Sequence, residues 1–274
     1  MGPRSNTKGA SGKHNGLPYD WDQYARRAKK GRFQDRIALH KKNVHLELIR
    51  DWAASLEGKI VLKTDANEEA FGADAFLNEL SATAAVAVGM DVSAEIVVRA
   101  KRRFPNLPYA AANVKNLPFL SSVFDIIISN STLDHLPREE VPEAVRELGR
   151  ILKPGAILIL TLDNKHNPLH VFSHWIRRFF GWFYTDRCYS VPETTRLLRE
   201  NGFQVLAATA VFHVPFPVNF LAKTAERFFG SGMNALIEGI IRICGGLDRF
   251  PTRYLTGRHI AFKARKPGED PSRD

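Results

Sequence analysis

Along the middle of the chain, segments with the apolar pattern of strands alternate with segments with the apolar pattern of helices. Apolar runs of about four to eight residues, typical of strands buried on both faces, predict strands at 59–62, 84–90, 109–112, 124–129 and 156–162. Apolar residues at helical spacing predict helices at 71–80, 93–104, 139–152 and 191–201. Two later apolar runs predict closing strands at 203–211 and 259–266.

Capping and breaking residues support these boundaries. Ser93 stands where the helix at 93–104 begins, and Pro105 directly follows its end. Strands separated by helices predict right-handed crossover connections. We therefore predict an α/β fold in which a doubly wound, mostly parallel sheet carries helices on both faces.

The chain reads as one domain with polar ends. Residues 1–18 are basic and have no apolar core, which predicts a disordered tail rather than a secretory signal. Residues 19–56 contain few helix breakers and predict a helical N-terminal extension of a domain that covers 19–266. Residues 267–274 form a short polar tail.

Polar residues crowd the end of the apolar strand at 124–129. Asn130, Ser131, Asp134 and His135 follow it directly. Ligands of open α/β sheets bind outside the carboxyl ends of the strands. We therefore expect the chemistry of this protein at that junction.

Four segments of the chain form an ordered set of motifs: VGMDVS at 88–93, ANVKNLPF at 112–119, FDIIISNSTLDHL at 124–136 and ELGRILKPGAILILTLDN at 147–164. Their order and spacing resemble the class I S-adenosylmethionine-dependent methyltransferases, from about residue 59 to residue 266. Together the four segments are fairly specific, although each one alone would be weak. The resemblance implies a Rossmann-like sheet, S-adenosylmethionine as cofactor and methyl transfer as activity.

The resemblance assigns the nucleoside part of the cofactor to two strand ends. It places the carboxylate of Asp91 on the ribose hydroxyls, and a carboxylate can accept both hydrogen bonds. Asn113 would accept a hydrogen bond from the adenine amino group, and Val114 would offer its backbone N–H to the ring. Val92 would pack on the adenine. The alternatives are a helix-start acid for Asp91 and a turn-forming amide for Asn113.

The end of the fourth strand would face the sulfonium and the acceptor. The resemblance places Asn130 and Ser131 there, where orienting the reactants supplies much of the catalysis. His135 is a candidate general base for a hydroxyl or amine acceptor. An equally good interpretation makes His135 a polar residue that orients the loop.

The turn after the first strand departs from the family pattern. Lys63 stands at the usual acidic position, and Asp65, Asn67 and Glu69 stand where glycines are usual. We favour a loop that holds the cofactor's ammonium group with Asp65 or Glu68. The alternatives are a lost cofactor site, which would leave a non-catalytic binding or scaffold protein, and a surface turn with no role.

Two late segments are expected to cap the acceptor pocket. Residues 165–190 are aromatic and basic, and residues 216–250 carry apolar residues at helical spacing, which fits a small, lipophilic or lipid-like acceptor. The second segment also fits helices on a membrane surface or a dimer interface. The spacing of His166, His170 and His174 (in 165–190) is typical of one helix face, so we expect no metal.

The net charge of +10 bears on which partners the protein is expected to bind. Basic residues exceed acidic ones in 1–50 and 167–274, whereas acidic residues exceed basic ones in 51–166. Basic flanks favour peripheral contact with an anionic membrane, with solubility as the alternative explanation. No nucleic-acid-binding motif is present, so nucleic acid is not an expected partner. Cys188 and Cys244 form neither a disulfide framework nor a metal motif, and we expect a cytoplasmic protein.

Overall fold

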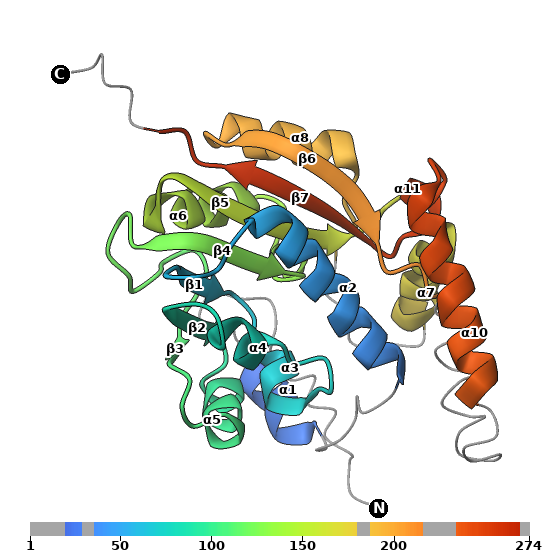
Figure 1. The fold of residues 1–274 in the computed structure, drawn as a ribbon, viewed down its shortest axis with the longest axis horizontal. Helices are drawn as coiled ribbons and strands as arrows, with labels where there is room; N and C mark the ends of the chain where they lie inside the picture. The colour runs from blue at the N-terminus through green and yellow to red at the C-terminus, as the bar shows by residue number, and fades with distance from the viewer. Residues whose placement is uncertain (1–19, 29–35, 180–186, 216–233, 269–274) are drawn as a thin grey trace, which may run out of the picture.

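A seven-stranded sheet runs through the middle of the computed structural model, which describes residues 20–28, 36–179, 187–215 and 234–268 (Figure 1). The strand order is β3-β2-β1-β4-β5-β7-β6. The first five strands are parallel, and β7 is antiparallel to both β5 and β6. The strands are β1 (Ile60–Lys63), β2 (Val86–Asp91), β3 (Tyr109–Ala111), β4 (Phe124–Asn130), β5 (Leu152–Asp163), β6 (Gln204–Val211) and β7 (His259–Arg265).

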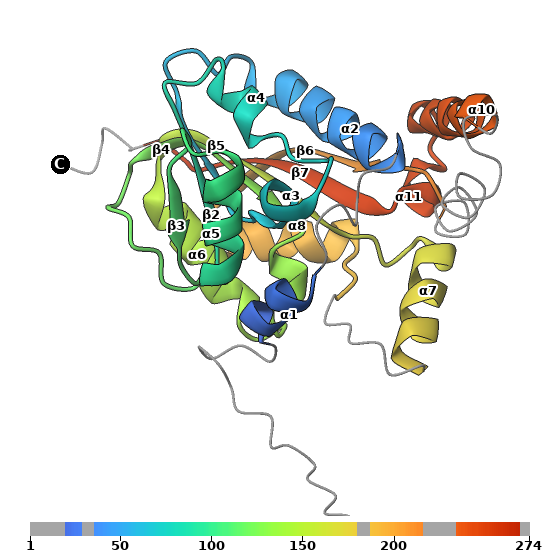
Figure 2. The ribbon, with the colours of Figure 1, turned by 90° about the horizontal axis from the view of Figure 1, so that it is seen from below.

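Helices cover both faces of this sheet, with α2 and α4 on one side and α6 and α8 on the other (Figure 2). Helices α7 and α10 lie at the same end of the molecule, apart from one another. The helices are α1 (Trp21–Arg27), α2 (Arg36–Ala53), α3 (Asn67–Phe71), α4 (Leu77–Ser81), α5 (Ala94–Arg103), η2 (Leu133–His135), α6 (Val141–Ile151), α7 (Pro168–Phe179), α8 (Val191–Glu200), α10 (Asn234–Gly245), η4 (Gly246–Arg249) and α11 (Arg253–Thr256).

The central strand β4 supplies the core on both faces. Ile126 and Ile128 pack in a cluster with apolar residues of α2 and α4, whereas Ile127 packs with those of α6 and α8. Successive side chains of a strand point to opposite faces, so an unbroken apolar run is what a two-sided core requires. The prediction of a doubly wound, mostly parallel sheet is confirmed.

The helix predicted at 71–80 is wrong as a single element. Helix α3 ends before Gly72, where a Cβ atom would lie 2.0 Å from a carboxylate oxygen of Asp74. Helix α4 then begins again at Leu77. Its first backbone N–H groups are held by the carboxylate of Glu69, which accepts from Phe76 at 3.3 Å and from Leu77 at 3.1 Å. A side chain of one helix therefore caps the next, and helical periodicity does not reveal such a contact.

The predicted extension at 19–56 contains two described helices with different roles. Ala25 of α1 and Ala28, which follows the helix, pack with apolar residues of α3 and α5. Helix α2 packs on the sheet through Leu46 and Ile49. The predicted tail at 1–18 lies outside the described residues. The same holds for 180–186 and 216–233 of the predicted caps and for 269–274 of the C-terminal tail.

Among the described helices, none combines the length and the hydropathy that a membrane span requires.

Core packing predicts the effect of two leucine truncations. Leu148 on α6 is fully buried, whereas Leu120, in the loop before β4, is 81% exposed. Leu148→Ala should lower the free energy of unfolding by about 2–5 kcal/mol, because it leaves a cavity. Leu120→Ala should change it by less than about 0.5 kcal/mol. Urea denaturation followed by circular dichroism measures both, and equal losses would contradict this description of the core.

Candidate functional site

The carboxyl ends of the parallel strands bring the predicted polar residues to one edge of the sheet. Asp91 ends β2, and Asn130 ends β4 on the other side of β1. Asn113 follows β3, which pairs with the end of β2. Residues far apart in the sequence therefore meet where ligands of such sheets bind.

The carboxylate of Asp91 is buried and oriented by the backbone. One oxygen accepts the N–H of Ser93 at 2.9 Å, and the other accepts the N–H of Ala66 at 3.1 Å. Burial raises the pKa of Asp91 to about 6, against the effect of these two donors. Each oxygen has a second lone pair, so the group can still accept hydrogen bonds from a diol.

Helix α1 lies against the start of α5, beside this carboxylate. The carboxylate of Asp22 accepts the hydroxyl of Ser93 at 2.5 Å and the N–H of Glu95 at 3.1 Å. The ring of Trp21 lies 4.9 Å, centroid to centroid, from the ring of His135. The candidate base is therefore packed beside an aromatic side chain of α1. The sequence alone predicts no role for α1 at the site.

Asn113 forms a turn. Its side-chain oxygen accepts the N–H of Lys115 at 3.0 Å, which is the turn-forming alternative to adenine binding. Val114 is buried and Val92 is half-buried, and both belong to the core that lies under this edge. The amide oxygen has a second lone pair, so the adenine contact stays a prediction.

Two buried polar atoms at the end of β4 have no hydrogen-bond partner among the described residues. They are Nδ2 of Asn130 and Oγ of Ser131. The other side-chain atom of Asn130 is fixed, since its oxygen accepts the hydroxyl of Thr161 at 2.7 Å. Ser131 has φ of +48°, a conformation that is uncommon outside glycine. Buried polar atoms without partners are rare, and here they fit a polar ligand.

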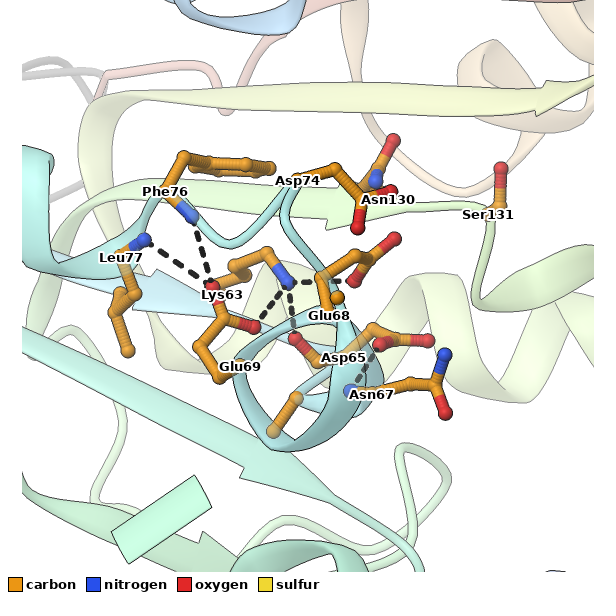
Figure 3. A network of polar contacts seen from close by, with 12 residues as sticks. Lys63, Asp65, Asn67, Glu68, Glu69, Asp74, Phe76, Leu77, Asn130 and Ser131 are labelled. Atoms are coloured by element: carbon orange, nitrogen blue, oxygen red, sulfur yellow. Dashed lines mark hydrogen bonds and ion pairs between the residues drawn. The ribbon is translucent and has the colours of Figure 1, made fainter. Parts of the chain in front are cut away.

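The glycine-less turn is built around a buried lysine (Figure 3). The side chain of Lys63 is fully buried, and its Nζ lies 3.0 Å from Glu68 and 2.8 Å from Glu69. It also donates to the backbone oxygen of Asp65. Burial opposes the charge of Lys63, but the two carboxylates outweigh it and raise the pKa of the ammonium group.

A second lysine extends this cluster to α2. Lys41 Nζ lies 3.0 Å from Glu68 and 3.2 Å from Asp74. Burial would raise the pKa of Glu68, but Lys63 and Lys41 together hold it well below the usual range. We call Lys41, Lys63, Glu68, Glu69 and Asp74 the lysine–carboxylate cluster. The sequence does not predict a role for Lys41, because no motif joins it to a turn more than twenty residues away.

The cluster changes the prediction for the cofactor's ammonium group. Both oxygens of Glu68 contact lysines of this chain, which leaves Asp65 as the candidate. One oxygen of Asp65 accepts the N–H of Asn67 at 2.7 Å. Burial, and then the nearby Glu68, raise the pKa of Asp65. The side-chain oxygen of Asn67 is buried and has no described partner, so it is a second acceptor for a cation.

Comparison with known proteins identifies a methyltransferase domain in the central part of the chain. Residues 68–160 match the family model described as a methyltransferase domain. An uncharacterized methyltransferase of Synechocystis is 28% identical over 134 residues, which cover 46% of this chain and 60% of that protein. The 2-phytyl-1,4-naphtoquinone methyltransferase of Nostoc is 33% identical over 95 residues, covering 32% of this chain and 41% of that one. The chain thus spans less than two thirds of the length of these relatives.

Solved structures share the fold. The geranyl diphosphate C-methyltransferase of Streptomyces coelicolor superposes with a TM-score of 0.55 at 13% identity, covering 82% of this chain and 77% of that one. At 13% sequence identity, this superposition shows the similarity of the two folds alone.

The lysine–carboxylate cluster predicts a large loss of stability on one substitution. Lys63→Met leaves the fully buried carboxylate of Glu69 without its cation, which should cost about 3–5 kcal/mol of unfolding free energy. Lys59→Met, at an exposed position four residues earlier, is the matched control and should change it by less than about 0.5 kcal/mol. Urea denaturation measures both variants. Similar stabilities would show that Lys63 does not neutralise Glu69.

Proposed function

We propose that this chain, a member of the class I S-adenosylmethionine-dependent methyltransferase family, transfers a methyl group from S-adenosylmethionine to a small, lipophilic acceptor. The observation that carries the proposal is the meeting of Asp91, Asn130 and Ser131 at one sheet edge. One of these residues offers an oriented carboxylate, and the other two offer buried polar atoms without described partners.

The residues at this edge divide the cofactor between them. Asp91 would accept the ribose hydroxyls, while Asn113 and Val114 would hold the adenine. Asp65 and Asn67 would hold the ammonium group, in place of a glycine-rich backbone approach. The described residues therefore fit S-adenosylmethionine, and the amino-acid end of the cofactor would be held by side chains.

When bound, S-adenosylmethionine supplies a methyl group on a positively charged sulfur. The chain's contribution is to orient the acceptor and, for a hydroxyl or amine, to accept its proton. His135 is the residue that we assign to proton acceptance. Its packing against Trp21 limits the orientations of the imidazole ring.

A lipophilic acceptor is supported by the side chains beyond the strand ends. Helix α7 exposes Phe172 at 56% and Trp175 at 61%, and their rings stack at 6.1 Å. The Nostoc and Streptomyces proteins are named for a 2-phytyl-1,4-naphthoquinone and for geranyl diphosphate, which are both lipophilic compounds. We also propose peripheral contact with an anionic membrane on its cytoplasmic side. The exposed apolar side chains of α7 and the excess of basic residues in 167–274 support this contact.

A second candidate function is binding without catalysis. The glycine-less turn, filled by the ammonium group of Lys63, favours this candidate. The two candidates differ in cofactor binding, which can be measured before the acceptor is known.

Calorimetric titration with S-adenosylhomocysteine separates the two candidates. The folded wild-type chain should bind it, and Asp91→Ala should weaken binding by about 1.5–3 kcal/mol, the scale of hydrogen bonds to a charged group. Asp51→Ala, at an exposed position on α2, should leave the affinity unchanged. Absence of binding by folded wild-type protein would favour the non-catalytic candidate. An unchanged affinity in Asp91→Ala would show that Asp91 does not bind the ribose.

The raised pKa of Asp91 predicts how this affinity depends on pH. Above its pKa of about 6, Asp91 is ionised and accepts two charge-assisted hydrogen bonds, whereas protonation at lower pH removes one acceptor site. Affinity for S-adenosylhomocysteine should therefore fall as the pH drops below about 6. Titrations at several pH values check this, with Asp91→Asn as the variant that should bind weakly at every pH. A wild-type affinity that is constant from about pH 8 to 5 would contradict the assignment.

A further inference from the structure

Three side chains with metal-binding atoms meet at the carboxyl end of β5, which runs parallel to β4. They are Asp163 at the end of β5, His170 on α7 and Cys188 just before α8. Their ligand atoms all lie within 4.8 Å of one another, and Oδ2 of Asp163 is 3.0 Å from Nε2 of His170. Asp163 and His170 are each 3% exposed, and Cys188 is half-buried. These three residues form what we call the Asp–His–Cys cluster.

The backbone holds Cys188 beside the end of β5. The N–H of Tyr189 donates to the backbone oxygen of Asp163 at 2.8 Å, and the N–H of Lys165 donates back to the oxygen of Tyr189 at 2.8 Å. This two-way pairing continues the sheet for one residue beyond the strand. The thiol and the carboxylate are therefore placed by hydrogen bonds that do not involve either side chain.

A side-chain cap at the start of α7 fixes the backbone of His170. The side-chain oxygen of Asn167 accepts the N–H of His170 at 2.9 Å, as a helix cap. Its amide nitrogen donates to the backbone oxygens of Thr256 and Gly257 at 2.8 and 3.2 Å, which anchors this turn to the segment before β7. All three members of the cluster thus stand on backbone with a fixed position, as a binding site requires.

A second layer of polar groups holds Asp163, one at its carboxylate and one at its backbone. Nε2 of His259, at the start of β7, lies 3.5 Å from Oδ1 of Asp163, the oxygen that does not face His170. The backbone N–H of Asp163 donates to a side-chain oxygen of the buried Asp134 at 3.2 Å. Metal-ligating carboxylates are oriented by outer groups such as His259.

The donor set selects among metals. Magnesium and calcium require oxygen ligands, and this cluster offers one carboxylate, one imidazole and one thiol. Zinc accepts all three, and its tetrahedral bonds to nitrogen and oxygen of about 2.0–2.2 Å place neighbouring ligand atoms about 3.3–3.6 Å apart. Asp163 and His170 lie 3.0 Å apart, so a small separation of the two side chains would admit the ion.

We propose that Asp163, His170 and Cys188 bind one zinc ion. Three protein ligands leave a fourth position for water or another ligand, the arrangement of zinc sites that do chemistry. This proposal does not depend on the proposed function, because none of its residues is assigned to the cofactor.

Cobalt spectroscopy tests the thiolate ligand directly. Full-length protein stripped with a chelator and titrated anaerobically with Co²⁺ should develop a near-ultraviolet thiolate-to-metal charge-transfer band at one equivalent, and Zn²⁺ should remove it. Cys188→Ser should abolish the band. Cys244→Ser, which removes the other cysteine of the chain, should retain it. No band in the wild-type protein, or a band that survives Cys188→Ser, would overturn the proposal.

Zinc competition against a chromophoric chelator tests the remaining ligands. His259→Ala, in the second layer, should weaken binding by about 10–100-fold, and His170→Ala by more than that. His166→Ala, at an exposed position four residues before His170, is the control and should bind like the wild type. Asp163→Asn keeps the shape of the side chain and should also lose affinity. Circular dichroism establishes that each variant is folded, and equal affinities of His170→Ala and His166→Ala would overturn the proposal.

Discussion

The buried ammonium group of Lys63 is the charge on which the carboxyl edge of the sheet depends. A lysine with no exposed side-chain surface is stable only if anionic partners offset the loss of its hydration. Glu68 and Glu69 provide that offset, and each has a second task. Glu69 caps the start of α4, while Glu68 reaches Lys41 on α2. One cation therefore joins the end of β1 to three of the surrounding helices.

This cluster changes how the turn after β1 contributes to the site. A glycine-rich turn acts through close approach of its backbone to a ligand. Here the N–H of Ala66 is already used, since it donates to the carboxylate of Asp91. The turn thus orients the residue that we assign to the ribose, and it leaves Asp65 and Asn67 to act through their side chains.

Much of the sheet could be predicted because its signal is local. The apolar run at 124–129 and its polar end are consecutive in sequence, and strand ends of a parallel sheet meet at one edge. Asp91 and Asn130 could therefore be placed at the same edge before the structure was known. The interruption between α3 and α4 could not, because it depends on a side-chain cap from Glu69.

The remaining parts of the site depend on contacts between distant segments. Lys41 reaches the turn from α2, and Trp21 reaches His135 from α1. Cys188 meets Asp163 only because strand pairing continues through Tyr189. No spacing rule connects such residues, since the fold rather than the chain makes them neighbours.

The lysine–carboxylate cluster, together with Asp65, contains two ammonium groups and four carboxylates. Burial raises the pKa of Asp74 and, with Glu68 beside it, that of Asp65, so this end of the site favours bound protons more than exposed carboxylates do. A cation that arrives beside Asp65 favours the ionised carboxylate and so opposes this rise in pKa. Cation binding and proton release are therefore linked at this end of the site, and wherever a proton is released the heat of binding depends on the buffer that takes it up.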